Sequence, residues 1–230
     1  MGDRIMNVLG IDSATEACSA AVLRNGALAS RRFQTIQRGH AEILIPLIQE
    51  AMREAGITFG ALNLIATTIG PGGFTGLRIG LASARALALA AAIPIIGVTT
   101  LEAVARAQTT RNMPTLICLD SKREDVYLQL FAGDDTPMTA PAALLPEEIP
   151  AVLPSGPVAI GGNARETVIA TLTERIPPPI LADGALLPDA EFVARIGLER
   201  FVAGTAVSEA PPRPLYLRAP DARLPGGGQA

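Results

Sequence analysis

An apolar run from Leu77 to Ile96 restricts the fold more than any other feature of this chain. It follows a glycine-rich segment, GPGGFTGLRIG (70–80), and predicts a helix over 75–92 that is apolar on nearly every side. Such a helix has to be buried on most of its surface. Because Arg78 and Arg85 interrupt the run, a membrane span is not expected. We therefore expect an internal helix of a soluble protein.

The glycine segment does not fit the two common phosphate-binding motifs. A P-loop needs a lysine and a hydroxyl directly after its last glycine, but Leu77 and Arg78 follow Gly76 here. A dinucleotide fingerprint needs glycine where this chain has Thr75. Gly76 and Gly80 are four residues apart, so they share one helix face and permit close backbone approach. A packing role for the glycines is favoured, and anion binding at the helix N-terminus stays the weaker alternative.

The remaining pattern is typical of the α/β class, with strands and helices alternating along the chain. Arg24-Asn25-Gly26 is a turn signal between two strand-like runs and predicts a β-hairpin. Residues 40–55 predict an amphipathic helix, with Pro46 as a kink or near its start. A composition shift near 108–113 marks the expected boundary between an N-terminal lobe over 1–108 and a C-terminal lobe over 109–221. Residues 222–230 are expected to form a disordered tail.

Charge and cysteine content narrow the function classes. The 230 residues carry a net charge of −3, which argues against tight binding of nucleic acid by the isolated chain. A local basic patch on the hairpin side remains an alternative, formed by Arg24, Arg31, Arg32 and Arg38. The two cysteines, Cys18 and Cys118, stand in apolar surroundings and are expected to be buried free thiols of a cytoplasmic protein.

Residues that could carry chemistry are few. His40 is the only histidine, and Leu44 stands where a second helical ligand would be, so no metal site is expected. Asp12 and Ser13 end the first strand, a position that can hold Mg²⁺ or phosphate or simply cap a turn. Gly161 and Gly162 follow a later strand and could touch a nucleotide or only turn the chain. Because no acid/base pair converges, no catalytic residues are assigned.

Six segments, taken in order, resemble the TsaB (YeaZ) family: LGIDSATEACSAAV, GHAEILIPLIQEAM, GPGGFTGLRIGLASARALA, GVTTLEAVA, LDSKREDVYLQLF and PLYLRAPDA. The resemblance runs from residue 8 to about 221, with Gly73 where the family often has serine and Ser13 where it often has threonine. It implies an actin-like ATPase fold (ASKHA, RNase H-like) with two related lobes. It also implies a role in making N6-threonylcarbamoyladenosine at position 37 of tRNA.

Family members resemble the catalytic TsaD subunit but are inactive partners of it, which implies a heterodimer with TsaD, joined by TsaE and in contact with tRNA only through the complex. The same surface is expected to form a homodimer when TsaD is absent. No cofactor of its own is implied, although ATP and Mg²⁺ can be present in the complex. The alternative is an ATP-binding enzyme of the sugar-kinase class with a nucleotide near Asp12, Ser13, Gly161 and Gly162. The partner surface expected on the helices over 40–55 and 75–92 consists of Leu44, Ile48, Ala51, Met52, Gly76, Leu77, Gly80, Leu81 and Ala84.

Overall fold

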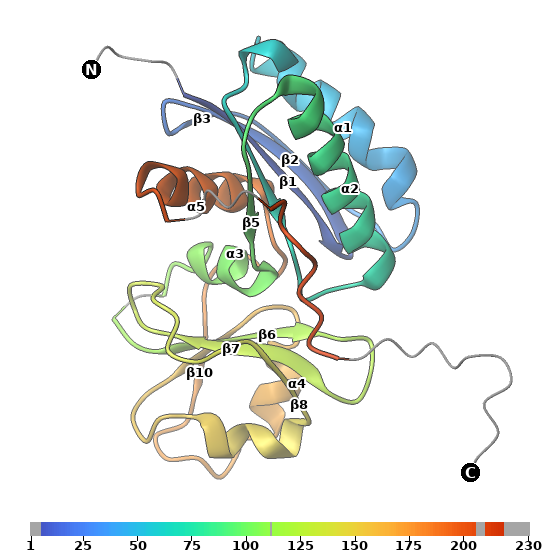
Figure 1. Ribbon diagram of the computed structural model, residues 1–230. Coiled ribbons are helices and arrows are strands. Elements are labelled where there is room, and N and C mark those ends of the chain that lie inside the picture. Colours follow the sequence, from blue (N-terminus) through green and yellow to red (C-terminus); the bar gives the residue numbers. More distant parts are fainter. Residues whose placement is uncertain (1–5, 111, 206–209, 219–230) are drawn as a thin grey trace, which may run out of the picture.

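The computed structural model describes residues 6–110, 112–205 and 210–218, and they form two lobes stacked one above the other (Figure 1). Each lobe is built on a five-stranded sheet, with strand orders β3-β2-β1-β4-β5 and β10-β9-β6-β7-β8. In both sheets three antiparallel strands in sequence are followed by two parallel strands. The shared topology confirms the prediction of two related α/β lobes. The predicted tail over 222–230 lies outside the described residues.

The first sheet contains the hairpin that the Asn25-Gly26 turn predicted. Asn25 and Gly26 both have positive φ, which a two-residue hairpin turn of this kind requires. The hairpin strands pair antiparallel, and two parallel strands reached through helices complete the sheet. The strands are β1 (Asn7–Thr15), β2 (Ala17–Arg24), β3 (Ala27–Thr35), β4 (Leu64–Thr68) and β5 (Ile95–Val98).

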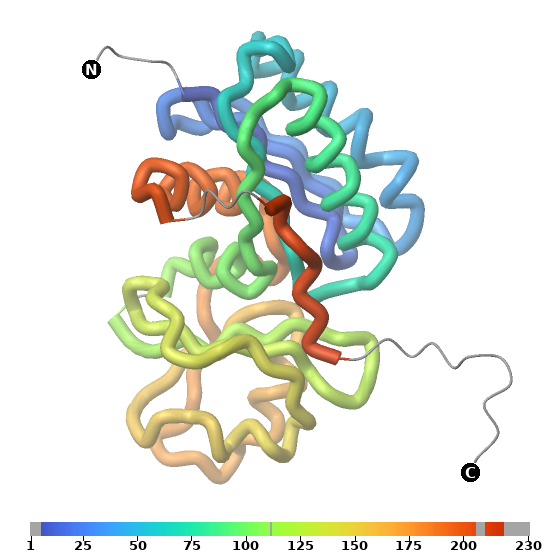
Figure 2. The backbone as a smooth tube through the Cα atoms, in the orientation of Figure 1, coloured from blue at the N-terminus to red at the C-terminus, as the bar shows by residue number. Residues whose placement is uncertain are grey.

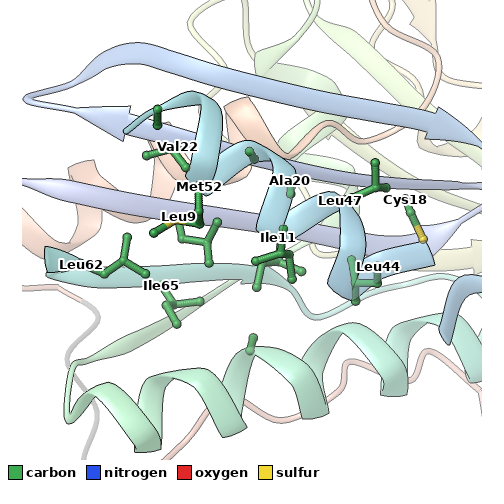
Figure 3. Packing of buried hydrophobic residues seen from close by; sticks show 14 of the residues in the cluster. Leu9, Ile11, Cys18, Ala20, Val22, Leu44, Leu47, Met52, Leu62 and Ile65 are labelled. Atoms are coloured by element: carbon green, nitrogen blue, oxygen red, sulfur yellow. The ribbon is translucent and has the colours of Figure 1, made fainter. Parts of the chain in front are cut away.

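Two helices cover one face of this sheet, α1 (His40–Glu54) and α2 (Phe74–Ala91), and a short 3-10 helix, η1 (Phe59–Ala61), precedes β4. Pro46 lies inside α1, so the helix continues through it. The largest buried apolar cluster fills the space between α1, α2 and the sheet. In Figure 3, Leu44, Leu47 and Met52 of α1 point toward Ile11, Ala20 and Val22 of the strands.

The second lobe repeats the arrangement with shorter elements. Its strands are β6 (Thr115–Asp120), β7 (Val126–Phe131), β8 (Ala142–Leu144), β9 (Ala159–Gly161) and β10 (Ile180–Leu181). The 3-10 helix η2 (Pro146–Val152) and helix α4 (Arg165–Ala170) cover its outer face. Ile149 and Val168 pack there against Leu116, Leu128 and Ile160 of the sheet. The second lobe therefore has a core of its own.

The space between the sheets holds α3 (Thr100–Arg106) and α5 (Ala190–Val202) (Figure 1). Thr99 caps α3, since its hydroxyl accepts from the Glu102 amide and the Glu102 carboxylate bonds back to the Thr99 amide. Helix α5 returns to the first lobe, where Val193 and Ala194 pack on strands β1, β4 and β5. The chain changes sheet between β5 and β6, and α5 packs on the first sheet although it lies within the range expected for the C-terminal lobe.

Helix α2 is long and apolar enough to cross a membrane by length and composition alone. In the structure it is a core helix of the first lobe. Leu77, Leu81 and Ala84 are buried, and Ala84 and Ala88 belong to the cluster beneath α1. The apolar composition of α2 is thus explained on its inner side by packing on the sheet.

Candidate functional site

A cleft of about 550 Å³ lies where the two lobes meet. The first lobe contributes the end of β1 (14–16), the start of α1 (37–42) and the glycine loop with the start of α2 (71–76). The second lobe contributes residues 119–122, Tyr127 and Asn163. These segments follow the carboxyl ends of β1, β4, β6 and β9, which is where α/β sheets usually bind ligands. The cleft is therefore the candidate functional site.

The glycine loop is used for packing on the end of β1. A Cβ on Gly72 would overlap the carbonyl oxygen of Ala14, and a Cβ on Gly76 would overlap that of Ser13. The amide of Gly73 donates to the Ala14 carbonyl over 2.7 Å, so it is not free to hold an anion. The interpretation of the glycines as close-packing residues is confirmed.

His40 begins α1 and points its ring toward the end of β1. Its Nε2 lies 2.8 Å from the carbonyl oxygen of Thr15, which can only accept, so Nε2 carries the proton. The residue one turn later, Leu44, is fully buried. Among the described residues no group of three or more His, Cys, Asp or Glu side chains could hold a metal ion. His40 therefore has the helix-start position that the sequence predicted.

Charged side chains join the lobes across the cleft. The Lys122 ammonium lies 2.6 Å from Oε2 of Glu16 and 2.8 Å from Oδ2 of Asp120. Asn163 donates to Oε1 of Glu16 over 2.9 Å and accepts from the Asp120 amide over 2.9 Å. The pKa of Asp120 is lowered, because hydrogen bonds to Lys122 outweigh the effect of burial. Glu16 and Asp120 are thus engaged with an internal cation.

Asp12 lies beneath the floor of the cleft, fully buried, on the face of the sheet that α5 covers. Its Oδ1 accepts from the Thr68 hydroxyl over 2.8 Å and from the Ala14 amide over 3.1 Å, while Oδ2 has no partner among the described residues. Desolvation by burial is the largest effect and raises the pKa of Asp12 to about 7. Ser13 is also buried, and its hydroxyl donates to the carbonyl of Gly76 over 2.8 Å.

The four residues expected to hold a nucleotide do not form a site. Neither Asp12 nor Ser13 lines the cleft, and their polar atoms face the protein interior. Gly161 packs on Gln108 and Ile117, and Gly162, with φ +91°, leaves no room for a Cβ beside the carbonyl of Cys118. The glycine pair serves backbone packing. None of the four residues presents a polar side chain to the cleft that could hold ATP or Mg²⁺.

The prediction that nine residues contact a partner chain is wrong. All of them are buried inside this chain, and Leu44, Ile48 and Met52 belong to the core cluster under α1. Figure 3 shows Leu44 and Met52 in this cluster. Gly80 packs on Ser13, so a larger residue there would disturb the fold itself and not a partner contact. The expectation failed because large apolar residues on these helices satisfy their own sheet first.

The outer face of α2 carries different residues. Five of its exposed positions recur every four residues and form one line: Phe74, Arg78, Ala82, Ala86 and Ala90. Leu89 stands beside this line and is 84% exposed. No charged residue occurs between Ala86 and Ala92. The spacing of four can be seen in the sequence. However, the sequence does not show which side of the helix faces outward, the side with these residues or the side with the buried leucines. We call these five residues with Leu89 the outer face of α2.

Two of the four arginines of the predicted basic patch, Arg31 and Arg32, pair with carboxylates of this chain. Arg31 bonds to the nearly buried Asp189, and Arg32 pairs with Glu50 and Glu54 of α1. Arg24 donates to the carbonyl of Ala55. Cys18 and Cys118 are free and buried, as expected.

Comparison with known proteins agrees with this architecture. The family described as "TsaD: tRNA N6-adenosine threonylcarbamoyltransferase" matches residues 34–173. The tRNA threonylcarbamoyladenosine biosynthesis protein TsaB of Escherichia coli is 33% identical, over 93% of this chain and 95% of its own. The structure of YeaZ from Pseudomonas aeruginosa superposes with a TM-score of 0.79 at 27% identity, covering 92% of this chain and all of that one. A ROK hexokinase from Thermus thermophilus, 16% identical over 86% of this chain and all of its own, shares the fold with a TM-score of 0.52. The chain has the two-lobed actin-like fold, and it belongs to the TsaB (YeaZ) family.

Proposed function

We propose that this chain is the non-catalytic partner subunit of a TsaD-type threonylcarbamoyltransferase in the synthesis of N6-threonylcarbamoyladenosine at position 37 of tRNA. The relative from Escherichia coli is named for this biosynthesis, and the TsaD family matches residues 34–173 of this chain. In this proposal TsaE joins the complex in the cytoplasm, and tRNA, ATP and Mg²⁺ are bound by the partner subunits.

The observation that carries the proposal is the outer face of α2. Leu89 is 84% exposed beside a line of three exposed alanines, Ala82, Ala86 and Ala90. On the neighbouring helix α1, Ile45 is 40% exposed. Small side chains let two helices approach closely, and an exposed leucine gains free energy of about 2 kcal/mol when a partner covers it. The face suits a helix pair of another chain.

The non-catalytic role is supported by how the polar groups of the cleft are used. His40 donates to the Thr15 carbonyl, and Glu16 and Asp120 hold Lys122. Asp12, the carboxyl that a Mg²⁺-dependent phosphoryl transfer would need, is fully buried. His40, Glu16 and Asp120 therefore have structural partners, and Asp12 does not line the cleft.

Light scattering after size exclusion tests the proposal, with this chain alone and mixed with TsaD from the same source. We expect a stable mixed complex and threonylcarbamoyl transfer to tRNA only in the mixture. Alone, this chain is expected to form a homodimer through the same face. Ala86→Arg should abolish pairing without lowering the melting temperature, because Ala86 is exposed.

A matched control is Ala151→Arg, which places the same charge on an exposed position of η2 in the second lobe. This variant should pair like the natural chain. Pairing that survives Ala86→Arg would rule out the outer face of α2 as the contact surface. ATP turnover by the chain alone would instead favour the enzyme alternative.

A further inference from the structure

The C-terminal segment 210–218 crosses from the first lobe to the second without regular structure (Figure 2). It contains the PLYLR part of the sequence motif at 214–218. The Leu215 amide donates to the carbonyl of Ile69 over 2.6 Å, and Arg85 of α2 donates to the carbonyl of Pro212. Beyond Leu215, Arg218 pairs with Asp125 of the second lobe. The segment is therefore fixed on both sides of Tyr216.

Tyr216 completes a stack of side chains at the start of α2. Its ring centroid lies 5.5 Å from that of Phe74, and its hydroxyl accepts from Nε of Arg78 over 3.0 Å. The Arg78 guanidinium lies 3.5 Å from the centroid of the Phe74 ring. Both rings stay partly open to solvent, with Phe74 45% and Tyr216 41% exposed. Phe74, Arg78 and Tyr216 together are called the anchor stack below.

The anchor stack is continuous with the outer face of α2. Phe74 and Arg78 begin the exposed line that Ala82, Ala86 and Ala90 continue. Within the described part of the chain Arg78 has no carboxylate partner, although it is exposed. Arg31 and Arg32 of the same lobe, by contrast, are engaged with carboxylates. Arg78 thus keeps a cation ready beside two aromatic rings.

We propose that the anchor stack is the energetic centre of the partner surface, and that the TsaD-type partner places a carboxylate against Arg78. This inference rests on the proposed function. Tyrosine and arginine are the residue types that dominate binding energy at protein interfaces. A guanidinium already oriented by a ring and a hydroxyl loses less conformational freedom when it pairs with a carboxylate. The exposed alanines allow a partner helix to approach α2 closely. The anchor stack provides most of the binding energy and fixes how the two chains are aligned.

The test measures the dissociation constant between the full chain and TsaD for single variants. Arg78→Gln should weaken binding about tenfold or more and reduce its salt dependence, because a desolvated charge pair is lost. Tyr216→Ala should weaken binding to a similar degree. Tyr216→Phe keeps the ring but removes the acceptor of the Arg78 bond, so we expect a smaller loss of about threefold. Melting temperatures of Arg78→Gln and Tyr216→Phe should equal that of the natural chain.

The matched control is Arg213→Gln, which removes one exposed arginine from the same segment outside the stack. It should change the dissociation constant less than about twofold. If Arg78→Gln also stays within twofold while Ala86→Arg abolishes pairing, the anchor stack is overturned and the proposed function stands. If neither variant weakens binding, or the natural chain does not bind TsaD, both proposals fall.

Discussion

The Thr68 hydroxyl donates to Oδ1 of Asp12 over 2.8 Å, while Oδ2 of the same buried carboxyl has no partner among the described residues. An ionised carboxylate in this position keeps one oxygen desolvated without compensation. Burial is accordingly the largest cause that raises the pKa of Asp12, to about 7. This pair links the end of β1 to β4 directly below the cleft.

Asp12→Asn should stabilise the protein increasingly as the pH rises. The folded pKa is raised above the unfolded value of 3.8, so the neutral acid is compatible with folding at low pH, and stability is lost as the carboxyl ionises toward pH 7. Between pH 4.5 and 7.5 the difference in unfolding free energy between variant and natural chain should grow by about 3 kcal/mol. Urea denaturation at both pH values measures it.

Asp120→Asn is the control, because the pKa of Asp120 is lowered by its bonds to Lys122. The stabilisation by ionised Asp120 is complete above the unfolded pKa and is lost only as the pH falls below it, so the difference for this variant should stay nearly constant between pH 4.5 and 7.5. A pH-independent difference for Asp12→Asn would mean that Asp12 is ionised in the folded protein throughout this range. Complex formation with TsaD should survive Asp12→Asn, since no step of the proposed function uses this carboxylate.

Gly80→Ala should destabilise the fold in a way that depends on Ser13. A Cβ on Gly80 would overlap the Ser13 hydroxyl oxygen but would lie 3.6 Å from the Ser13 Cβ, an ordinary contact. Overpacking at such a position costs about 1–3 kcal/mol. Removing the hydroxyl by Ser13→Ala should make Gly80→Ala neutral or stabilising, because alanine is favoured over glycine inside a helix.

A double-mutant cycle of thermal or urea unfolding measures this coupling. Ser13→Ala alone should cost about 1 kcal/mol through the lost bond to the Gly76 carbonyl. The alternative outcome is that the two losses of unfolding free energy simply add in the double variant. It would show that α2 moves away from β1, and that the contact with the Ser13 hydroxyl is not the reason for glycine at position 80.

The thiols of Cys18 and Cys118 should be inert in the folded protein. Burial raises the pKa of Cys18 to about 12 and that of Cys118 further still, and only the thiolate is a good nucleophile. Titration with a thiol reagent at pH 8 should count no reactive group in the native chain and two in urea. A rapidly reacting thiol in the native state would reveal local opening of β2 or β6.

Local chemistry in the sequence predicted much of the fold, because it acts through neighbouring residues. The Asn25-Gly26 turn and the Thr99 cap fix their own backbone and needed no tertiary information. The outer face of α2 could not be predicted in this way. A helix with leucine on one side and alanine on another can turn either side inward, and only the space above β1 decides it. The position of α5 on the first sheet likewise depends on contacts far apart in sequence.

The two polar ties across the cleft should contribute unequally to stability. The Lys122 side chain is 65% exposed, so its ion pairs with Glu16 and Asp120 are screened by solvent and should contribute less than about 1 kcal/mol. Asn163 bonds to Glu16 and to the Asp120 amide through two hydrogen bonds whose donors are uncharged. Loss of both bonds should lower the free energy of unfolding by about 1–2 kcal/mol.

The two contributions can be distinguished by measuring the unfolding of Lys122→Met and Asn163→Ala in low and in high salt. In 1 M salt the screening length is only about 3 Å, so the loss of stability caused by Lys122→Met should vanish. The loss caused by Asn163→Ala should persist, because it does not depend on a charged donor. Equal salt sensitivity of both variants would show that the lobes are joined by charge and not by the amide.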